Sequence, residues 1–149
     1  VVYHSRSAAD DETETQVGAA RCASVGSLLE QSDFVSLHCP ATPDTYHLMN
    51  ADRFRQMNRH AFLVNTSRGD VVDDEALIAA LDDRQIAGAA LDVYEGEPSV
   101  NHRLLGRDNV VLVPHLGSAT VESRVAMGRR AIANIDAFVA QQALPDRIA

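Results

Sequence analysis

The sequence contains no lysine and no tryptophan, and only two cysteines among its 149 residues. All 13 cationic side chains are therefore arginines, and 21 acidic residues give the chain a net charge of -8. An acidic chain without a basic cluster has little with which to neutralise phosphates, so we expect no nucleic-acid partner. Cys22 and Cys39 have neither metal-ligand spacing nor the density of a disulfide scaffold, which predicts no metal site and favours reduced thiols in a cytoplasmic protein.

Long apolar runs are also missing. No segment approaches the ~18 residues that a membrane-spanning helix needs, so we expect no membrane partner. The chain turns polar after Tyr3, which predicts no secretory signal, and it lacks an initiator methionine, so we expect it to begin inside a longer protein. Because no repeat or Pro/Gly-rich linker divides the sequence, we expect residues 1–149 to form one domain.

Short apolar runs alternate with longer amphipathic stretches along the chain. The runs typical of strands are Val1–His4, Arg21–Ser24, Phe34–Cys39, Ala61–Thr66, Ile86–Tyr94 and Val110–Pro114. The stretches typical of helices are Ser27–Gln31, Ala51–Met57, Asp73–Asp83 and Val121–Gln142. Several strand-like runs are continuously apolar, as in strands that are buried on both faces of a parallel sheet. This alternation predicts an α/β fold built on an open sheet with right-handed crossovers.

Two of the predicted helices carry clear start signals. Asp73 or Asp74 is placed to cap the third helix, and Thr120 is placed to cap the last. Apolar residues recur every three or four positions in the last helix, which predicts one continuous buried stripe made of Val121, Val125, Gly128, Ile132, Ile135 and Val139. The acidic run from Asp10 to Glu14 is interpreted as a solvated loop or a helix start.

Polar side chains follow the last three predicted strands. Arg68 comes soon after the fourth run, the carboxylates Asp92, Glu95 and Glu97 follow the fifth run or end it, and His115 follows the sixth. Because the carboxyl ends of parallel strands meet at one edge of a sheet, we expect these residues to emerge at the same edge. An arginine, a carboxylate and an imidazole can together hold an anionic substrate and move a proton.

Each of these residues has a plainer interpretation when it is taken alone. An arginine beside a glycine is usually a solvated turn residue, and a glutamate before a proline is an ordinary loop residue. The adjacent His38 and Cys39 suggest a metal site only superficially, because neighbouring residues of a strand point to opposite faces. The functional interpretation therefore rests on the combination of an arginine, a carboxylate and a histidine after successive strands.

At this point the sequence resembles a known family, the D-isomer-specific 2-hydroxyacid dehydrogenases. The resemblance covers nearly the whole chain, and its motifs are Ser36-Leu37-His38-Cys39-Pro40 with Thr42 and Thr45, Asn65-Thr66-Ser67-Arg68-Gly69 with Val72-Asp73 and Ala76-Leu77, Gly88-Ala89-Ala90-Leu91-Asp92-Val93 with Glu97-Pro98, and Pro114-His115-Leu116-Gly117-Ser118-Ala119-Thr120. The residues around Arg68 and His115 are most similar to the glyoxylate/hydroxypyruvate reductase branch of this family.

The resemblance implies roles for the three polar residues. Arg68 is expected to grip a 2-oxo acid through its carboxylate and carbonyl oxygens, because a planar guanidinium offers paired donors in fixed geometry. His115 is expected to protonate the carbonyl oxygen while a nicotinamide delivers hydride to the carbon. Glu97 is expected to bond to the far ring nitrogen of His115, fixing its tautomer and raising its pKa.

One part of the family pattern is missing from the sequence. The phosphate-binding turn G-x-G-x-x-G does not occur, and Val1–His4 is similar to the second strand of a dinucleotide-binding domain. We therefore expect a Rossmann-like, doubly wound parallel sheet that lacks its first strand and glycine turn. Its last helix is expected to return toward a substrate domain that is also missing. Alone, such a chain is expected to be inactive.

The exit of the Val1–His4 strand bears on the choice of cofactor. An acidic residue there favours NAD, whereas an arginine accommodates the 2′-phosphate of NADP. Arg6, with hydroxyls at Ser5 and Ser7, favours NADP, although a solvent-facing Arg6 would leave NAD possible. With these, the residues expected to bind the cofactor are Cys39, Pro40, Thr45, Thr66, Ser67, Arg68, Asp92, His115 and Gly117.

The predicted function is hydride transfer between NAD(P)H and a small 2-oxo acid, with glyoxylate and hydroxypyruvate as the favoured substrates and a homodimer as the assembly implied by the resemblance. D-3-phosphoglycerate and D-lactate dehydrogenases of the same family are alternatives. A non-catalytic, dinucleotide-sensing corepressor module on the same scaffold is the alternative from another functional class. Acidic composition and the lack of a long disordered tail favour the enzyme.

Overall fold

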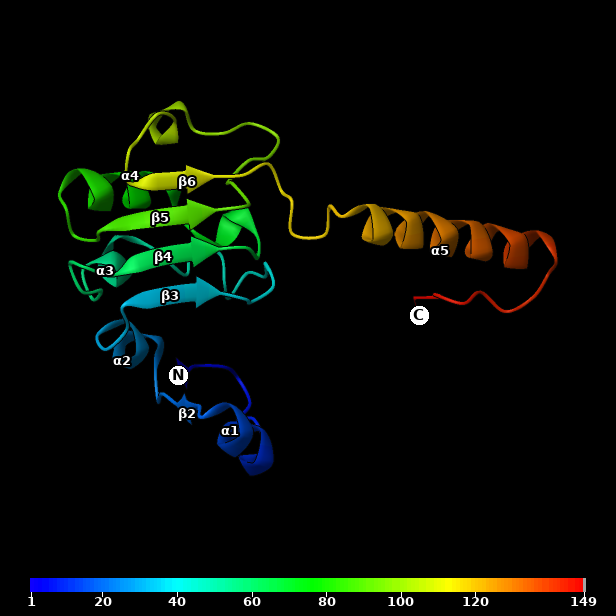
Figure 1. The fold of residues 1–149 in the computed structure, drawn as a ribbon, viewed down its shortest axis with the longest axis horizontal. Coiled ribbons are helices and arrows are strands. Elements are labelled where there is room, and N and C mark those ends of the chain that lie inside the picture. Colours follow the sequence, from blue (N-terminus) through cyan, green and yellow to red (C-terminus); the bar gives the residue numbers. More distant parts are fainter. Residues whose placement is uncertain (149) are drawn as a thin grey trace. The chain divides into compact units, whose positions relative to one another are not determined.

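The computed structural model describes residues 1–148, which form two compact units, Val1–Pro114 and His115 onward. The first unit contains strands β1 (Val2–Tyr3), β2 (Ala20–Arg21), β3 (Phe34–Leu37), β4 (Phe62–Asn65), β5 (Gly88–Leu91) and β6 (Val110–Leu112). Its helices are α1 (Asp11–Val17), α2 (Val25–Leu29), α3 (Ala51–Phe54) and α4 (Asp74–Asp82), with 3-10 turns η1 (Gly69–Val71) and η2 (His102–Leu104). Helix α5 (Val121–Val139) belongs to the second unit (Figure 1).

Strands β3, β4, β5 and β6 form one sheet in that spatial order, and every neighbouring pair is parallel (Figure 1). The register aligns Leu37 with Asn65 and Asn65 with Leu91, so three strands end side by side. The predicted α/β fold with a parallel sheet is confirmed. Segments that follow these strands therefore leave the sheet at a single edge, called here the exit edge.

The hydrophobic core lies on one face of this sheet. Val35, Leu63 and Leu91 are almost fully buried and share a core cluster with Leu29 of α2 and Leu77 of α4. Helices α2, α3 and α4 all contribute to this one cluster, so they cover the same face.

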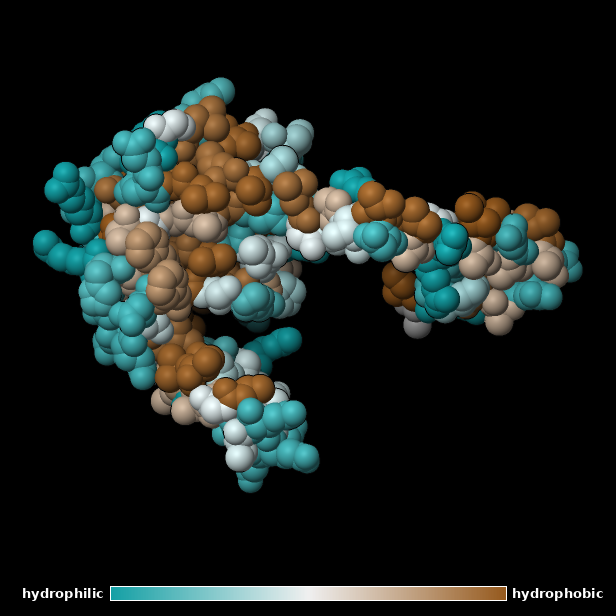
Figure 2. Space-filling view, viewed as in Figure 1, coloured by the Kyte–Doolittle hydropathy of each residue, from teal (hydrophilic) through white to brown (hydrophobic). Residues whose placement is uncertain are grey.

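The opposite face of the sheet is open among the described residues. Phe34 is 71% and Val111 63% exposed, and Phe34 stacks on Phe62 with ring centroids 5.5 Å apart. Apolar residues gather over this part of the molecule (Figure 2). The expectation that the strands are buried on both faces is therefore wrong for residues 1–148, because the helices that pack on the sheet cover one side only.

Strands β1 and β2 pair in parallel as a separate two-stranded sheet. Within residues 1–148, neither β1 nor β2 is hydrogen-bonded to the β3–β6 sheet. Strand β1 is linked to helix α1 by a side-chain hydrogen bond, in which the Tyr3 hydroxyl donates to the Glu14 carboxylate.

Side-chain caps set the helix starts. Asp73 accepts from the Ala76 amide at the start of α4 and Thr120 accepts from the Ser123 amide at the start of α5, as predicted. Asp10 caps α1, so the acidic run is a helix start. The predicted strand Arg21–Ser24 is wrong beyond Arg21, because Ser24 forms a capping box with Ser27 and begins α2.

Helix α5 forms as expected, but its apolar stripe is not buried within the described chain. Val121, Ile132 and Val139 are 75%, 58% and 75% exposed, and Ala137 is the one buried residue of the helix. The prediction of a buried stripe is wrong for residues 115–148 because this unit contains no second helix or strand to cover it. No helix of the described residues is long and apolar enough to cross a membrane.

Candidate active site

A pocket of about 490 Å³ opens at the exit edge, where β3 and β4 end. Its walls are two short segments, His38–Ala41 after β3 and Thr66–Arg68 after β4. The structure thus brings five residues of the predicted site to one pocket, namely Cys39, Pro40, Thr66, Ser67 and Arg68. His38 and Ala41 also line it and were not predicted.

Asn65, the last residue of β4, shapes the turn that carries Arg68. Its side chain is 1% exposed. The Asn65 amide nitrogen donates to the Arg68 carbonyl at 2.9 Å, and its oxygen accepts from the Ser67 amide at 3.0 Å and the Ser67 hydroxyl at 2.9 Å. The Ser67 hydroxyl is thus engaged by Asn65, so its contribution to a cofactor site would come from its backbone.

Arg68 itself is exposed at the pocket, and its Nη1 donates to the Ser67 carbonyl at 2.6 Å. A guanidinium has five N–H donors in a planar fork, so this single bond orients the group while further donors remain for a carboxylate. The geometry therefore suits the recognition of a small anion.

Gly69 allows the Arg68 turn to contact the turn after β5. A Cβ atom at this position would lie 1.8 Å from the Tyr94 carbonyl oxygen and 2.6 Å from the Glu95 amide nitrogen. No side chain fits there without a backbone shift, so the two turns are in direct backbone contact only because residue 69 is glycine.

Glu97 lies in this second turn, where it is exposed and its Oε1 accepts from the Tyr94 amide at 2.9 Å. Tyr94 is buried, its hydroxyl donates to the Val113 carbonyl at 2.7 Å, and burial raises the pKa of its phenol. The turn that carries Glu97 is thus anchored to the end of β6.

Asp92 directly follows β5 and is 5% exposed. Its amide donates to the Asn65 carbonyl at 2.9 Å, which extends the β4–β5 ladder by one residue. The carboxylate lies at the exit edge as predicted from the sequence.

Cys39, Pro40 and Thr45 belong to the loop after β3. The Thr45 hydroxyl donates to the Pro40 carbonyl at 2.6 Å and accepts from the Thr42 amide at 2.8 Å, so it closes the loop beside the pocket. Burial raises the pKa of the half-buried Cys39 thiol. The structure places Thr45 in this supporting position, outside the pocket walls.

Ser5, Arg6 and Ser7 follow β1 and are all exposed. Arg21 of β2 holds their turn, because its Nη2 donates to the Ser5 carbonyl at 2.8 Å and the Arg6 carbonyl at 3.3 Å. Arg21 was not predicted as part of this site.

His115 and Gly117 begin the second unit. His115 is exposed and has a positive φ of 52°. Its expected pairing with Glu97 joins residues of different units and stays a prediction.

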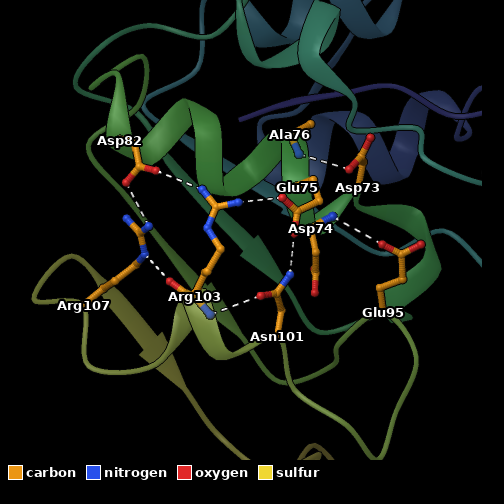
Figure 3. Close-up of polar contacts among 9 residues, drawn as sticks. All are labelled: Asp73, Asp74, Glu75, Ala76, Asp82, Glu95, Asn101, Arg103 and Arg107. Carbon is orange, nitrogen blue, oxygen red and sulfur yellow. Dashed lines mark hydrogen bonds and ion pairs between the residues drawn. The ribbon is translucent and has the colours of Figure 1, made fainter.

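The sequence patterns also did not predict an acidic cluster that lies beside the turns after β4 and β5. Asp73 and Asp74 lie at the start of α4, where Glu95 faces them and where His47 lies between Glu95 and Asp73. Figure 3 shows the Glu95 carboxylate directed at the backbone nitrogen of Asp74. Burial, and then the charges of Glu95 and Asp73, raise the pKa of Asp74 to about 6. The carboxylates are visible in the sequence, but the partners are too far apart along the chain for local patterns to reveal them.

A separate network of largely exposed ion pairs runs along α4, from Glu75 at its start to Asp82 at its end. Arg103 bonds to Glu75 at 2.7 Å and to Asp82 at 3.3 Å, and Arg107 bonds to Asp82 at 2.8 Å (Figure 3). These contacts fasten the η2 loop to α4. The described residues contain no cluster of histidine, cysteine and carboxylate groups that could hold a metal ion.

The residues present fit part of a dinucleotide. The pocket combines the hydroxyl of Thr66, the guanidinium of Arg68 and the apolar ring of Pro40 at the edge where parallel sheets bind nucleotides. The sequence offers no G-x-G-x-x-G turn for the pyrophosphate. These residues therefore fit a nicotinamide dinucleotide in part, without a glycine turn for its pyrophosphate.

Comparison with known proteins settles the family. The model of the D-isomer specific 2-hydroxyacid dehydrogenase NAD binding domain matches residues 1–117. The chain belongs to this family. Its curated relatives include the glyoxylate reductase of Thermofilum pendens, which is 50% identical over 129 residues, or 86% of this chain and 38% of that protein.

Two solved structures of other dehydrogenases and reductases show the same fold. The apo D-mandelate dehydrogenase of Rhodotorula graminis superposes with a TM-score of 0.86 at 36% identity, covering 99% of this chain and 43% of that one. The NADPH-dependent glyoxylate/hydroxypyruvate reductase of Sinorhizobium meliloti, in complex with NADP and malonate, gives 0.88 at 33% identity, covering 99% and 45%. The chain thus spans less than half the length of these relatives.

Proposed function

We propose that this chain is part of an oxidoreductase that transfers a hydride between a nicotinamide dinucleotide and a small 2-oxo acid, with glyoxylate and hydroxypyruvate as the favoured substrates. The observation that carries the proposal is the exposed guanidinium of Arg68 at the mouth of the exit-edge pocket. The names of the relatives, glyoxylate reductase and glyoxylate/hydroxypyruvate reductase, support this choice of substrates.

The proposed division of labour follows from the chemistry of each group. Arg68 binds the substrate carboxylate and polarises its carbonyl through paired N–H donors. The bound dinucleotide supplies the hydride that adds to the carbonyl carbon. His115 gives its proton to the carbonyl oxygen, so that the product is a neutral hydroxyl, and takes the proton back in the reverse direction. Glu97 orients the imidazole and favours its protonated form.

We propose NADP(H) as the preferred cofactor, with NAD(H) as the alternative. Arg6 provides a cation and Ser7 a hydroxyl donor where a 2′-phosphate would lie after β1, while the Ser5 hydroxyl donates to the Ser7 carbonyl and closes this turn. The Sinorhizobium meliloti relative in complex with NADP supports this assignment. In the whole protein we propose a cytoplasmic homodimer.

Other 2-hydroxy acids of the family, including D-lactate and D-3-phosphoglycerate, are the alternative substrates, and the D-mandelate dehydrogenase relative adds an aromatic one. A dinucleotide-sensing corepressor module is the alternative without turnover. Catalytic turnover separates the two classes, because a sensor binds the dinucleotide without consuming it.

The test is NADPH and NADH oxidation by the full-length protein that contains this chain, against a panel of 2-oxo acids. We expect the fastest turnover with glyoxylate or hydroxypyruvate and NADPH. His115→Gln should lower kcat by at least about 100-fold while the Kd for NADPH stays within about twofold, because the imidazole is the proposed proton donor but only one of many expected cofactor contacts. Full activity in this variant, or no turnover with any 2-oxo acid in the wild type, would contradict the proposal.

A further inference from the structure

His47 joins two of the segments that surround the proposed site. Its amide donates to the Asp70 carbonyl at 2.8 Å, two residues beyond Arg68. The next residues continue this pairing, because the Met49 amide donates to the Val71 carbonyl at 3.0 Å. The segment that contains His47 is thus fixed against the segment that follows Arg68.

The imidazole of His47 contacts a carboxylate from a third segment. Its Nε2 lies 2.7 Å from Oε1 of Glu95, and its Nδ1 lies 3.7 Å from Oδ2 of Asp73. The ring of Tyr46 stacks on the imidazole with centroids 3.9 Å apart. Both side chains of the His47–Glu95 pair are about three-quarters buried, with exposed fractions of 26% and 31%. A polar contact that is shielded to this degree is screened less by solvent than one at the surface.

Glu95 has a second bond on its other oxygen. Oε2 accepts from the Asp74 amide at 3.4 Å, at the N-terminus of α4, where backbone N–H groups have no partner within the helix (Figure 3). One carboxylate therefore links the turn after β5 to His47 on one side and to α4 on the other. Glu95 also lies two residues before Glu97 and within the backbone contact that Gly69 permits.

We propose that Glu95 and His47 are positioning residues that hold the turn carrying Glu97 against the turn carrying Arg68. The proposal rests on the proposed function, in which these two turns supply the groups that bind substrate and orient the imidazole. Neither Glu95 nor His47 lines the pocket, so they act through the backbone that they hold in place. Displacement of a catalytic group by about 1 Å costs on the order of 100-fold in rate, so a loosened turn has a measurable effect.

The test variant is Glu95→Gln in the full-length protein. The amide keeps the size of the side chain but removes the charge that faces His47. We expect kcat with the best 2-oxo acid to fall by about 10- to 100-fold, while the Kd for NADPH stays within about twofold because the residues after β1 are untouched. Hydrogen–deuterium exchange of residues 94–97 should become at least about fivefold faster, since the turn has lost its outer anchor.

His47→Asn removes the other partner of the His47–Glu95 contact. Asparagine tolerates the left-handed backbone of position 47, where φ is 49°, but its short side chain cannot span the distance to Glu95. We expect a loss of kcat at least as large as for Glu95→Gln, and no further loss in the double variant, because both single changes act on the same His47–Glu95 contact.

Glu75→Gln is the matched control. Glu75 belongs to the same helix start, but its carboxylate bonds to Arg103 in the exposed network and faces away from the turns (Figure 3). This variant should leave kcat and the exchange of residues 94–97 unchanged. The proposal is overturned if Glu95→Gln and His47→Asn lower only the melting temperature. In that outcome, kcat per folded molecule and the hydrogen–deuterium exchange of residues 94–97 would equal those of the Glu75→Gln control. If the wild type shows no 2-oxo acid turnover, the proposed function fails, and the exchange measurement alone decides for or against the positioning role.

Discussion

The turn after β4 and the turn after β1 occupy equivalent places at strand ends, yet they are held very differently. The first is fixed by buried Asn65, which makes three hydrogen bonds to it, and by the backbone contact at Gly69. The second, residues 5–7, is exposed and is held from outside by one nitrogen of Arg21.

This difference matches what the two turns are proposed to bind. Arg68 has to meet a reacting group whose position must be fixed closely, so a rigid support is of use there. Arg6 has to meet a phosphate on a flexible ribose, where a looser charge suffices for recognition. We therefore expect changes at the first turn to cost more than changes at the second, and the following predictions are arranged by the size of that cost.

Arg68→Lys should have the largest effect. The ammonium keeps the charge but loses the paired, planar donors, and kcat/KM for the 2-oxo acid should fall by about 1,000-fold, or roughly 4 kcal/mol. Steady-state kinetics with the full-length protein measure this. The melting temperature should be unchanged because Arg68 is exposed; a fall in kcat/KM of less than about tenfold would show that the fork is not needed.

Gly69→Ala should come next, because it separates the two turns. The added Cβ would overlap backbone atoms of Tyr94, so the unfolding free energy should fall by about 3 kcal/mol. Chemical denaturation gives this value. Gly128→Ala is the matched control, since a Cβ meets nothing within 4 Å there and alanine favours a helix. Equal stability of the two variants would mean that the close contact is not maintained.

Asp74→Asn should stabilise the protein above pH 6. A carboxyl whose pKa is raised to about 6 when folded, from 3.8, binds its proton more tightly in the folded state. Its ionisation therefore lowers stability as the pH rises from about 4 to 6, and the cost, at most about 3 kcal/mol, persists at higher pH. The variant should gain roughly 2 kcal/mol at pH 7.5 and almost nothing at pH 4, as measured by denaturation at both values. Asp52→Asn is the control at an exposed site, because the Asp52 carboxylate is 77% exposed.

Arg21→Ala should have the smallest effect and tests the looser turn. Loss of its bonds to the Ser5 and Arg6 carbonyls frees the turn, so the Kd for NADPH should rise about fivefold, or about 1 kcal/mol, and the Kd for NADH should change by less than twofold. Fluorescence titration measures both. Arg6→Ala should give a larger change in the same direction. An equal loss for both cofactors would show that this turn does not select the 2′-phosphate.

The sequence predicts the part of this site that depends on local pattern. The strand ends that precede Arg68, Asp92 and Glu97, and the caps Asp73 and Thr120, follow from periodicity and from the chemistry of helix starts. Pro40 and Arg68 share a pocket as parallel topology requires. These features need no knowledge of how turns from different strands touch.

The contacts between turns were not predictable in the same way. The His47–Glu95 hydrogen bond joins residues that are 48 positions apart in the sequence. The contact at Gly69 depends on how closely the turns after β4 and β5 approach each other in space. The burial predicted from hydropathy was also wrong at the open sheet face and on α5. An apolar pattern indicates which face prefers burial, but it does not indicate which element covers that face.

The parallel direction of β3 to β6 gives the two edges of the sheet separate tasks. The entry edge, where His60 pairs with Asp33 across the starts of two strands, carries none of the residues assigned to binding or catalysis. Selection for thermal tolerance and selection for a new substrate can therefore act on different ends of the same strands. A designer could strengthen the entry edge in one library and vary the pocket walls in another, then combine the best members with little interference.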